Sequence, residues 1–149
     1  MSPLLNYTTR IDVVKTVGEI SKMLVAHKAK AILTEYGANS EIIALSFKVL
    51  TPHGEIGIRL PVNADATLRV LKDQWTRGTI PYRFVNREQA VRIAWRIVKD
   101  WVAAQMAILE TEMVKMEEIF LPYMVMATGK TLYETIEGKK FYLGQGEER

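Results

Sequence analysis

Residues 69–99 combine basic and aromatic side chains in a pattern that could bind a polyanion. This segment holds eight lysine or arginine residues and two acidic residues, whereas residues 100–149 hold five basic and nine acidic residues. The basic residues are Arg69, Lys72, Arg77, Arg83, Arg87, Arg92, Arg96 and Lys99. Tyr82 and Phe84 lie between them, so cations could neutralise phosphates while aromatic rings stack on bases. These ten residues form the predicted nucleic-acid-binding site; alternatively, the cations only solvate the outer faces of two helices.

Other patterns that could carry chemistry are incomplete. Gly129-Lys130-Thr131 resembles the end of a phosphate-binding loop, but Met124 stands where the full pattern requires its first glycine. The absence of cysteine excludes disulfides, thiol catalysis and zinc-thiolate sites. His27 and His53 are too few for a multi-histidine metal centre. We therefore predict no catalytic residue, no metal site and no cofactor.

The length and composition predict one domain with a real hydrophobic core. The chain has 149 residues, of which 48% are hydrophobic. Its longest apolar runs are far shorter than the 18 or more residues of a membrane span, and its N-terminus does not read as a charged-then-apolar leader, so we expect a cytoplasmic protein without a membrane partner. We divide it into an αβ unit at 1–61, a helical part with a basic surface at 62–121, and a C-terminal hairpin or short helix with a tail at 122–149.

The first part predicts a small antiparallel sheet in β-α-β-β-β order, and hence the α+β class. We expect a first strand at 6–11 and then a helix capped by Asp12. Strands follow at 29–36, 41–50 and 55–61, the last two joined by a tight turn. In the middle strand of these three, Ile43, Leu45, Phe47 and Val49 alternate and should share the inward face.

Two helices are expected in the second part. Asn63 has the position of an N-cap and Gly78 follows the helix end, with Ala64, Leu68, Leu71 and Trp75 as the buried stripe. An extended connector at 79–85 leads to Asn86, the predicted N-cap of a long helix that nothing interrupts before Pro122. Trp75 and Trp95 both fall on buried stripes.

The long helix has a basic start and an acidic end, which is opposite to what the helix dipole favours. Arg92, Arg96 and Lys99 share one face near its start. Either an antiparallel neighbouring helix places its acidic end beside these residues, or they face a polyanion. The apolar sector of the helix covers about half its circumference, more than one sheet needs. We therefore expect it to pack also on a helix of this chain or of a second subunit, and predict a homo-oligomer.

Three stretches resemble small uncharacterised proteins encoded by tailed bacteriophages and prophages. They are LLNYTT at 4–9, IAWRIVKDWVAAQMAILETEM at 93–113 and FLPYMVMATGKTLYE at 120–134. The resemblance implies a setting, the cytoplasm of a phage-infected prokaryote, and no site residues.

We interpret the chain first as a non-enzymatic accessory protein of phage replication, recombination or gene control that binds single-stranded DNA or RNA. One alternative is an inhibitor of host defence that sequesters a phosphorylated nucleotide in a basic pocket between subunits. Another is a structural oligomeric adaptor.

Overall fold

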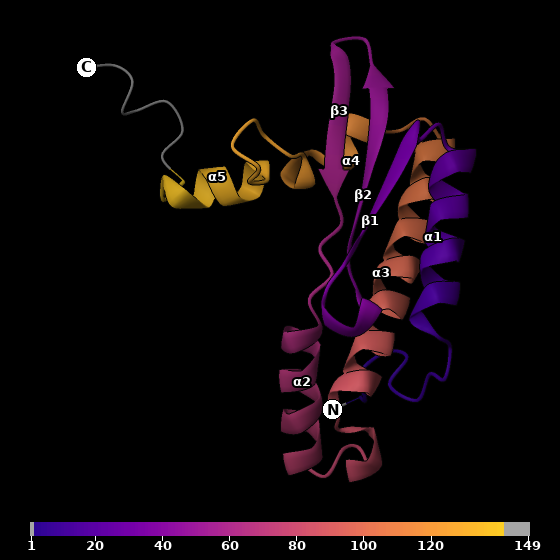
Figure 1. Cartoon of the computed structure of the whole chain (residues 1–149), viewed down its shortest axis with the longest axis vertical. Helices are drawn as coiled ribbons and strands as arrows, with labels where there is room; N and C mark the ends of the chain where they lie inside the picture. The colour runs from indigo at the N-terminus through magenta and orange to yellow at the C-terminus, as the bar shows by residue number, and fades with distance from the viewer. Residues whose placement is uncertain (1, 142–149) are drawn as a thin grey trace.

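The computed structural model describes residues 2–141 and confirms a small α+β fold (Figure 1). The helices are α1 (Val13–Ala26), α2 (Ala64–Thr76), α3 (Arg87–Glu110), α4 (Met116–Ile119) and α5 (Leu132–Gly138). The strands are β1 (Ala31–Tyr36), β2 (Ile42–Thr51) and β3 (Gly54–Arg59), and the short 3-10 turns are η1 (Ala38–Ser40), η2 (Tyr82–Phe84) and η3 (Leu121–Tyr123). None of the helices described combines the length and the apolar character needed to cross a membrane.

The three strands form an antiparallel sheet in the order β1-β2-β3. Leu45, Phe47 and Val49 of β2 are buried, as their alternation predicts. The prediction for Ile43 is wrong, because the register shifts where Tyr36 pairs with Ile42 and leaves Ile43 in a β-bulge. The extra residue reverses the alternation, so Ile42 is buried and Ile43 is exposed.

The expected first strand at 6–11 is wrong, and the element order before α2 is α-β-β-β. Residues 4–9 turn sharply, and their backbone groups bond to side chains of α2 and α3 rather than to a strand. The Leu4 N–H donates to Gln74 Oε1 at 3.0 Å, and Gln89 Nε2 donates to the Tyr7 carbonyl at 2.9 Å. These partners satisfy the polar backbone that a sheet ladder would otherwise satisfy.

The predicted boundaries of α2 and the start of α3 are confirmed by local contacts. Asn63 Oδ1 accepts from the Ala66 N–H at 2.9 Å, and Asn86 Oδ1 accepts from the Gln89 N–H at 2.8 Å. Gly78, with φ +74°, follows the end of α2 in the left-handed conformation that glycine adopts readily. Asp12 precedes α1 but its side chain makes no capping hydrogen bond.

Helix α3 lies at the centre of the molecule, between α1 and α2 (Figure 1). Trp95 and Val102 face the core shared with α1 and the sheet, and Ile93 packs with Leu71 of α2 in a second cluster. Most of the broad apolar sector of α3 is therefore covered within one chain. A second subunit is not needed to bury it, and the homo-oligomer stays a prediction.

Helix α3 ends at Glu110, so the prediction of an unbroken helix up to Pro122 is wrong. Glu112 has a φ of +62°, and the chain turns there before α4. Continued as a helix, the chain would carry Phe120 roughly 15 Å past Glu110. The turn brings Phe120 back to the core, where its ring lies 5.4 Å from that of Phe47. Burying this ring is worth about 1.5–3 kcal/mol, which favours the turn.

The C-terminal part lies against the free edge of β3 and then leaves the sheet (Figure 1). The Val125 N–H donates to the Gly57 carbonyl at 2.8 Å. Thr131 and Glu134 form a reciprocal capping box that starts α5, which confirms a short helix in this part. The predicted tail, GQGEER at 144–149, lies outside the described residues.

Candidate nucleic-acid interface

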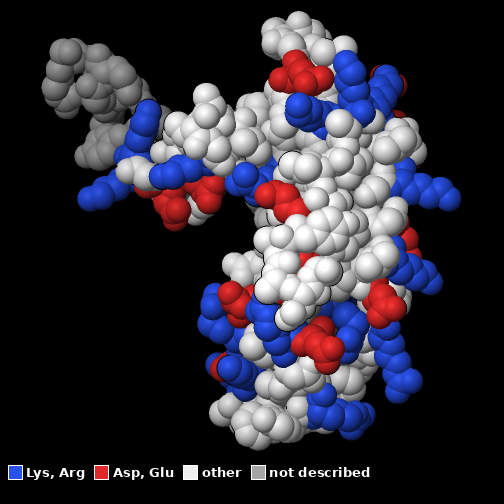
Figure 2. Space-filling view, in the orientation of Figure 1, with Lys and Arg blue, Asp and Glu red and all other residues white. Residues whose placement is uncertain are grey.

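Most of the predicted site residues lie at one end of the molecule, formed by α2, η2 and the start of α3. We call residues 64–92 and the adjoining residues 4–12 the α2–α3 end. Figure 2 shows lysine and arginine side chains crowding this lower part of the molecule, with acidic side chains among them. The contacts of each cation decide which of them could meet a ligand.

Two of the predicted cations are balanced by carboxylates on the surface. Arg77 Nε lies 3.1 Å from Asp73 Oδ2, one turn earlier in α2. Arg87 Nη1 lies 2.7 Å from Asp65 Oδ1, and its Nη2 lies 3.6 Å from Glu41 Oε1. These pairs reduce the positive charge that either arginine offers to a polyanion.

Arg96 and Lys99 are also paired, and Arg96 lies between α3 and α1. Arg96 Nη1 lies 2.8 Å from Glu19 Oε1 and 3.2 Å from Thr16 Oγ1, and its side chain is only 13% exposed. Lys99 Nζ lies 3.7 Å from Asp100 Oδ1. The expectation that Arg96 lies on an open face is wrong, because α1 covers it. The partner is the middle of α1, which runs in the same direction as α3, and not the acidic end of an antiparallel helix (Figure 1).

Four predicted cations form no ion pair within the part of the chain that the structure describes: Arg69, Lys72, Arg83 and Arg92. Arg10, which the sequence interpretation did not include, is unpaired among the described residues in the same way. Arg69 and Lys72 are exposed on α2. All five lie at the α2–α3 end, so this end carries five cations without an ion-pair partner among residues 2–141.

Three of these cations, Arg10, Arg83 and Arg92, converge on a cavity of about 430 Å³ that we call the arginine pocket. Its other lining residues are Thr8, Thr9, Phe84, Asn86 and Gln89. No acidic residue is among these eight described residues. A cavity with this lining attracts anions and repels cations.

Arg92 is held in place by Gln89, which is itself fixed by the N-terminal segment. Gln89 Nε2 donates to the carbonyls of Tyr7 and Thr9, both at 2.9 Å. Its Oε1 is therefore the end that faces Arg92 and accepts from Nη2 at 2.6 Å. Arg92 Nε is buried and has no hydrogen-bond partner among the described residues. Arg92 has no ion-pair partner among the described residues, so its charge is available to an anionic ligand.

Aromatic rings lie beside the pocket on the η2 turn. Phe84 is half-buried, its ring lies 5.2 Å from that of Tyr7, and the Arg83 guanidinium carbon lies 4.6 Å from its centroid. Tyr82 is 64% exposed and its ring centroid lies 4.8 Å from that of Trp75. The predicted extended connector is thus wrong here, because a 3-10 turn presents these rings.

The prediction that Trp75 belongs to the core is wrong, whereas that for Trp95 is confirmed. Trp75 is 46% exposed and Trp95 is fully buried. Gln74 takes the inward position on α2, because the Leu4 N–H gives its Oε1 a partner. Nothing local in the sequence indicates that the chain start supplies this partner, nor that Arg10 joins the pocket.

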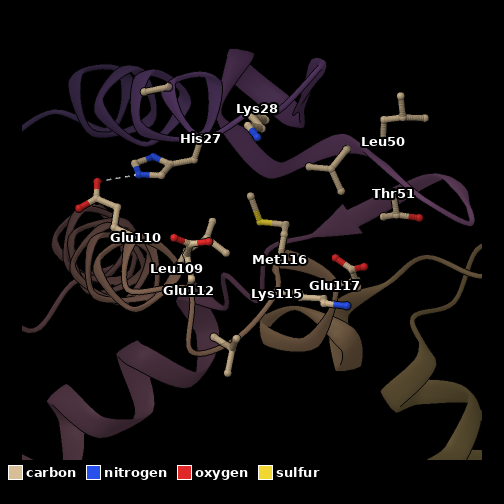
Figure 3. A pocket seen from close by; sticks show the side chains of 13 residues that line it. His27, Lys28, Leu50, Thr51, Leu109, Glu110, Glu112, Lys115, Met116 and Glu117 are labelled. Carbon is tan, nitrogen blue, oxygen red and sulfur yellow. Dashed lines mark hydrogen bonds and ion pairs between the residues drawn. The ribbon is translucent and has the colours of Figure 1, made fainter.

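A second cavity, of about 560 Å³, lies at the other end of α3 (Figure 3). Its walls carry both signs of charge, including Lys28, Lys115 and Glu112, so it does not match a polyanion. His27 Nε2 lies 3.0 Å from Glu110 Oε2 at its rim. A hydrogen bond to a backbone carbonyl, and then the contact with Glu110, raise the pKa of His27 above its ordinary value.

Comparisons with protein-family models, curated proteins and solved structures found no match for this chain. The class of this protein is therefore defined by its fold and its candidate site alone. It is a small α+β protein with a basic end, an arginine-lined cavity and an exposed pair of aromatic rings.

Proposed function

We propose that the protein binds single-stranded nucleic acid through the α2–α3 end, without catalysing a reaction. The observation that carries this proposal is the exposed Trp75–Tyr82 pair in the same end as cations that have no carboxylate partner among the described residues. The resemblance to phage proteins adds a setting, in which the chain is an accessory protein of replication, recombination or gene control in the host cytoplasm.

Both parts of a nucleic-acid strand, its phosphates and its bases, could bind side chains at this end. Arginine and lysine bind the phosphate backbone of any sequence and release its counterions. Exposed rings stack on bases only when the bases are unpaired and unstacked, so Trp75 and Tyr82 favour a single strand over a duplex.

The test is the salt dependence of oligonucleotide affinity, measured by fluorescence anisotropy. Replacing Arg69 and Lys72 together with glutamine should reduce the log-log slope by about 1.4, because each single-strand phosphate contact contributes about 0.7. Both side chains are exposed, so stability should change by no more than about 0.5 kcal/mol for each. Tyr82→Ala should cost about 1–3 kcal/mol of binding per stacked base and leave the slope nearly unchanged.

The matched control removes two exposed lysines elsewhere, in the variant Lys22→Gln/Lys28→Gln. This variant has the same net charge as Arg69→Gln/Lys72→Gln, but its changes lie near the end of α1 and just beyond it. Equal losses of affinity and slope in the two double variants would show a response to net charge alone. That result would refute the α2–α3 end as the binding surface.

A second candidate is sequestration of a phosphorylated nucleotide, which the arginine pocket favours. The pocket is lined by residues of one chain, whereas the sequence interpretation placed such a pocket between subunits. Mass spectrometry of ligands that co-purify at low salt separates the candidates, because a discrete nucleotide and a long nucleic acid differ in mass. Light scattering of the same sample tests the proposed homo-oligomer.

A further inference from the structure

We infer that the arginine pocket binds a terminal phosphate, the phosphomonoester at the end of a nucleic-acid strand. This inference deepens the proposed function, since it gives the strand bound at the α2–α3 end a defined terminus. It differs from backbone binding, in which internal phosphodiesters are contacted without regard to where the strand ends.

Charge is the first reason. The pocket gathers Arg10, Arg83 and Arg92, and none of the described residues that line it is acidic. A phosphodiester carries one negative charge, whereas a phosphomonoester carries about −1.5 to −2 at pH 7 and exposes three strong acceptor oxygens. Three arginines that line one cavity therefore match a monoester better than a diester.

The second reason is that donor groups of the pocket are held in place before a ligand binds. Gln89 fixes the Arg92 guanidinium, and the Phe84 ring supports that of Arg83. Thr9 Oγ1 accepts from the Ile11 N–H at 3.2 Å, which leaves the hydroxyl proton able to donate to an anion. Donors held in place lose little conformational entropy on binding, so this pocket is prepared for a phosphate.

Shape is the third reason. At about 430 Å³, the cavity lies within the range of small-ligand sites, roughly 300–1,000 Å³, and could hold a phosphate with its sugar. Tyr82 is two residues from Phe84, and its exposed ring lies against Trp75. A strand that begins in the pocket could thus continue over these rings, with its first nucleotide enclosed and the later ones on the surface.

The same chemistry occurs in a free mononucleotide, so the experiment includes both sources of a phosphomonoester. Anisotropy would compare oligothymidylates of about eight nucleotides, a typical single-strand site size, that carry a 5′-phosphate, a 3′-phosphate or hydroxyls at both ends. We expect one phosphorylated end to bind about tenfold more tightly, the scale of added charge-assisted hydrogen bonds. A thermal shift with thymidine monophosphate tests the free nucleotide.

Substitutions assign this preference to the pocket. Arg92→Gln and Arg83→Gln should each reduce the end preference to about twofold or less, because each removes a guanidinium from the phosphate. Arg69→Gln, on α2 outside the pocket, should weaken all three oligonucleotides equally. Arg83 is exposed, so Arg83→Gln remains informative if Arg92→Gln perturbs the fold.

The pH dependence provides an independent readout. The second pKa of a phosphomonoester is about 6, so the end preference should shrink between about pH 7.5 and about pH 5. Arginine stays charged over this pH range, so its contribution to the affinity for the hydroxyl-ended oligonucleotide should change little.

The outcomes separate this inference from the proposed function. Equal affinity for all three oligonucleotides, without a thermal shift by the mononucleotide, overturns the phosphate pocket and leaves strand binding intact. A thermal shift that Arg83→Gln abolishes, without oligonucleotide binding, supports phosphomonoester binding in the pocket but overturns both the strand end as its ligand and the proposed function. Binding of neither ligand overturns both.

Discussion

Replacing Arg96 should destabilise the protein much more than replacing Arg77, although both arginines pair with a carboxylate. The two ion pairs have similar lengths, 2.8 Å for Arg96–Glu19 and 3.1 Å for Arg77–Asp73. They differ in burial, because the side chains are 13% and 33% exposed in the first pair and 58% and 53% exposed in the second. The comparison therefore sets a partly buried pair between α1 and α3 against an exposed pair within α2.

The expected magnitudes follow from these exposures. Exposed pairs contribute about 0.2–1 kcal/mol and helical i,i+4 pairs about 0.3–0.5 kcal/mol. Breaking a fully buried pair costs about 3–5 kcal/mol, since one charge is left without a partner. Arg96–Glu19 is half-buried, so we expect a coupling free energy of about 1–2 kcal/mol, against about 0.5 kcal/mol or less for Arg77–Asp73.

The assay is a double-mutant cycle by urea unfolding, with each of the four residues changed to alanine singly and in pairs. The unfolding midpoint should shift while the slope m stays constant, which keeps the comparison within two-state behaviour. Raising the salt concentration should weaken the exposed coupling more than the buried one.

Equal coupling free energies in the two cycles would refute this reasoning. Arg96 would then be as loosely held as Arg77, and the interpretation of Arg92, Arg96 and Lys99 as an open polyanion-binding stripe would regain its basis. A larger coupling for Arg96 assigns this residue to the packing of α1 on α3.

Two further predictions concern a pH-sensitive contact and a helix cap. The pKa of His27 is raised above 6.5, first by its hydrogen bond to the Met23 carbonyl and then by Glu110. The contacts of the charged imidazole therefore stabilise the folded protein below about pH 6.5, and this stabilisation is lost as the pH rises through the raised pKa. Glu110→Gln should thus lower the melting temperature more at about pH 5.5 than at about pH 8.5, and equal losses would contradict it. Asn63→Ala should lower the free energy of unfolding by about 1 kcal/mol in urea. Asp12→Ala should cost less, because the Asp12 side chain makes no capping hydrogen bond. Equal costs would show that the capping bond of Asn63 contributes little.

The sequence by itself determines the helices and strands whose positions depend on neighbouring residues. Asn63, Gly78 and Asn86 act within one turn of their helices, so α2 and the start of α3 lie where predicted. The alternation in β2 and the turn after Thr51 likewise act over a few residues and predict the β2–β3 hairpin. These signals depend on local backbone geometry, which the sequence carries directly.

Features that depend on how separate elements pair or pack were decided only by the tertiary structure. The bulge that exposes Ile43 depends on how β1 pairs with β2. Arg96 is a good candidate ligand residue until Glu19, 77 positions earlier, is brought against it. Periodicity specifies which residues share a face of a helix, but not which other element covers that face.

The candidate site likewise contains residues that the sequence indicates and residues that only the tertiary structure brings to it. Basic and aromatic residues close together in the sequence indicate Arg83, Phe84 and Arg92, and all three line the arginine pocket. Arg10 enters it only because the chain start turns back onto α3, where Gln89 binds the carbonyls of that segment. Trp75 becomes exposed because the same segment gives Gln74 a buried partner. A contact between segments about 70–80 residues apart, satisfying polar groups that neither segment satisfies alone, thus forms the site.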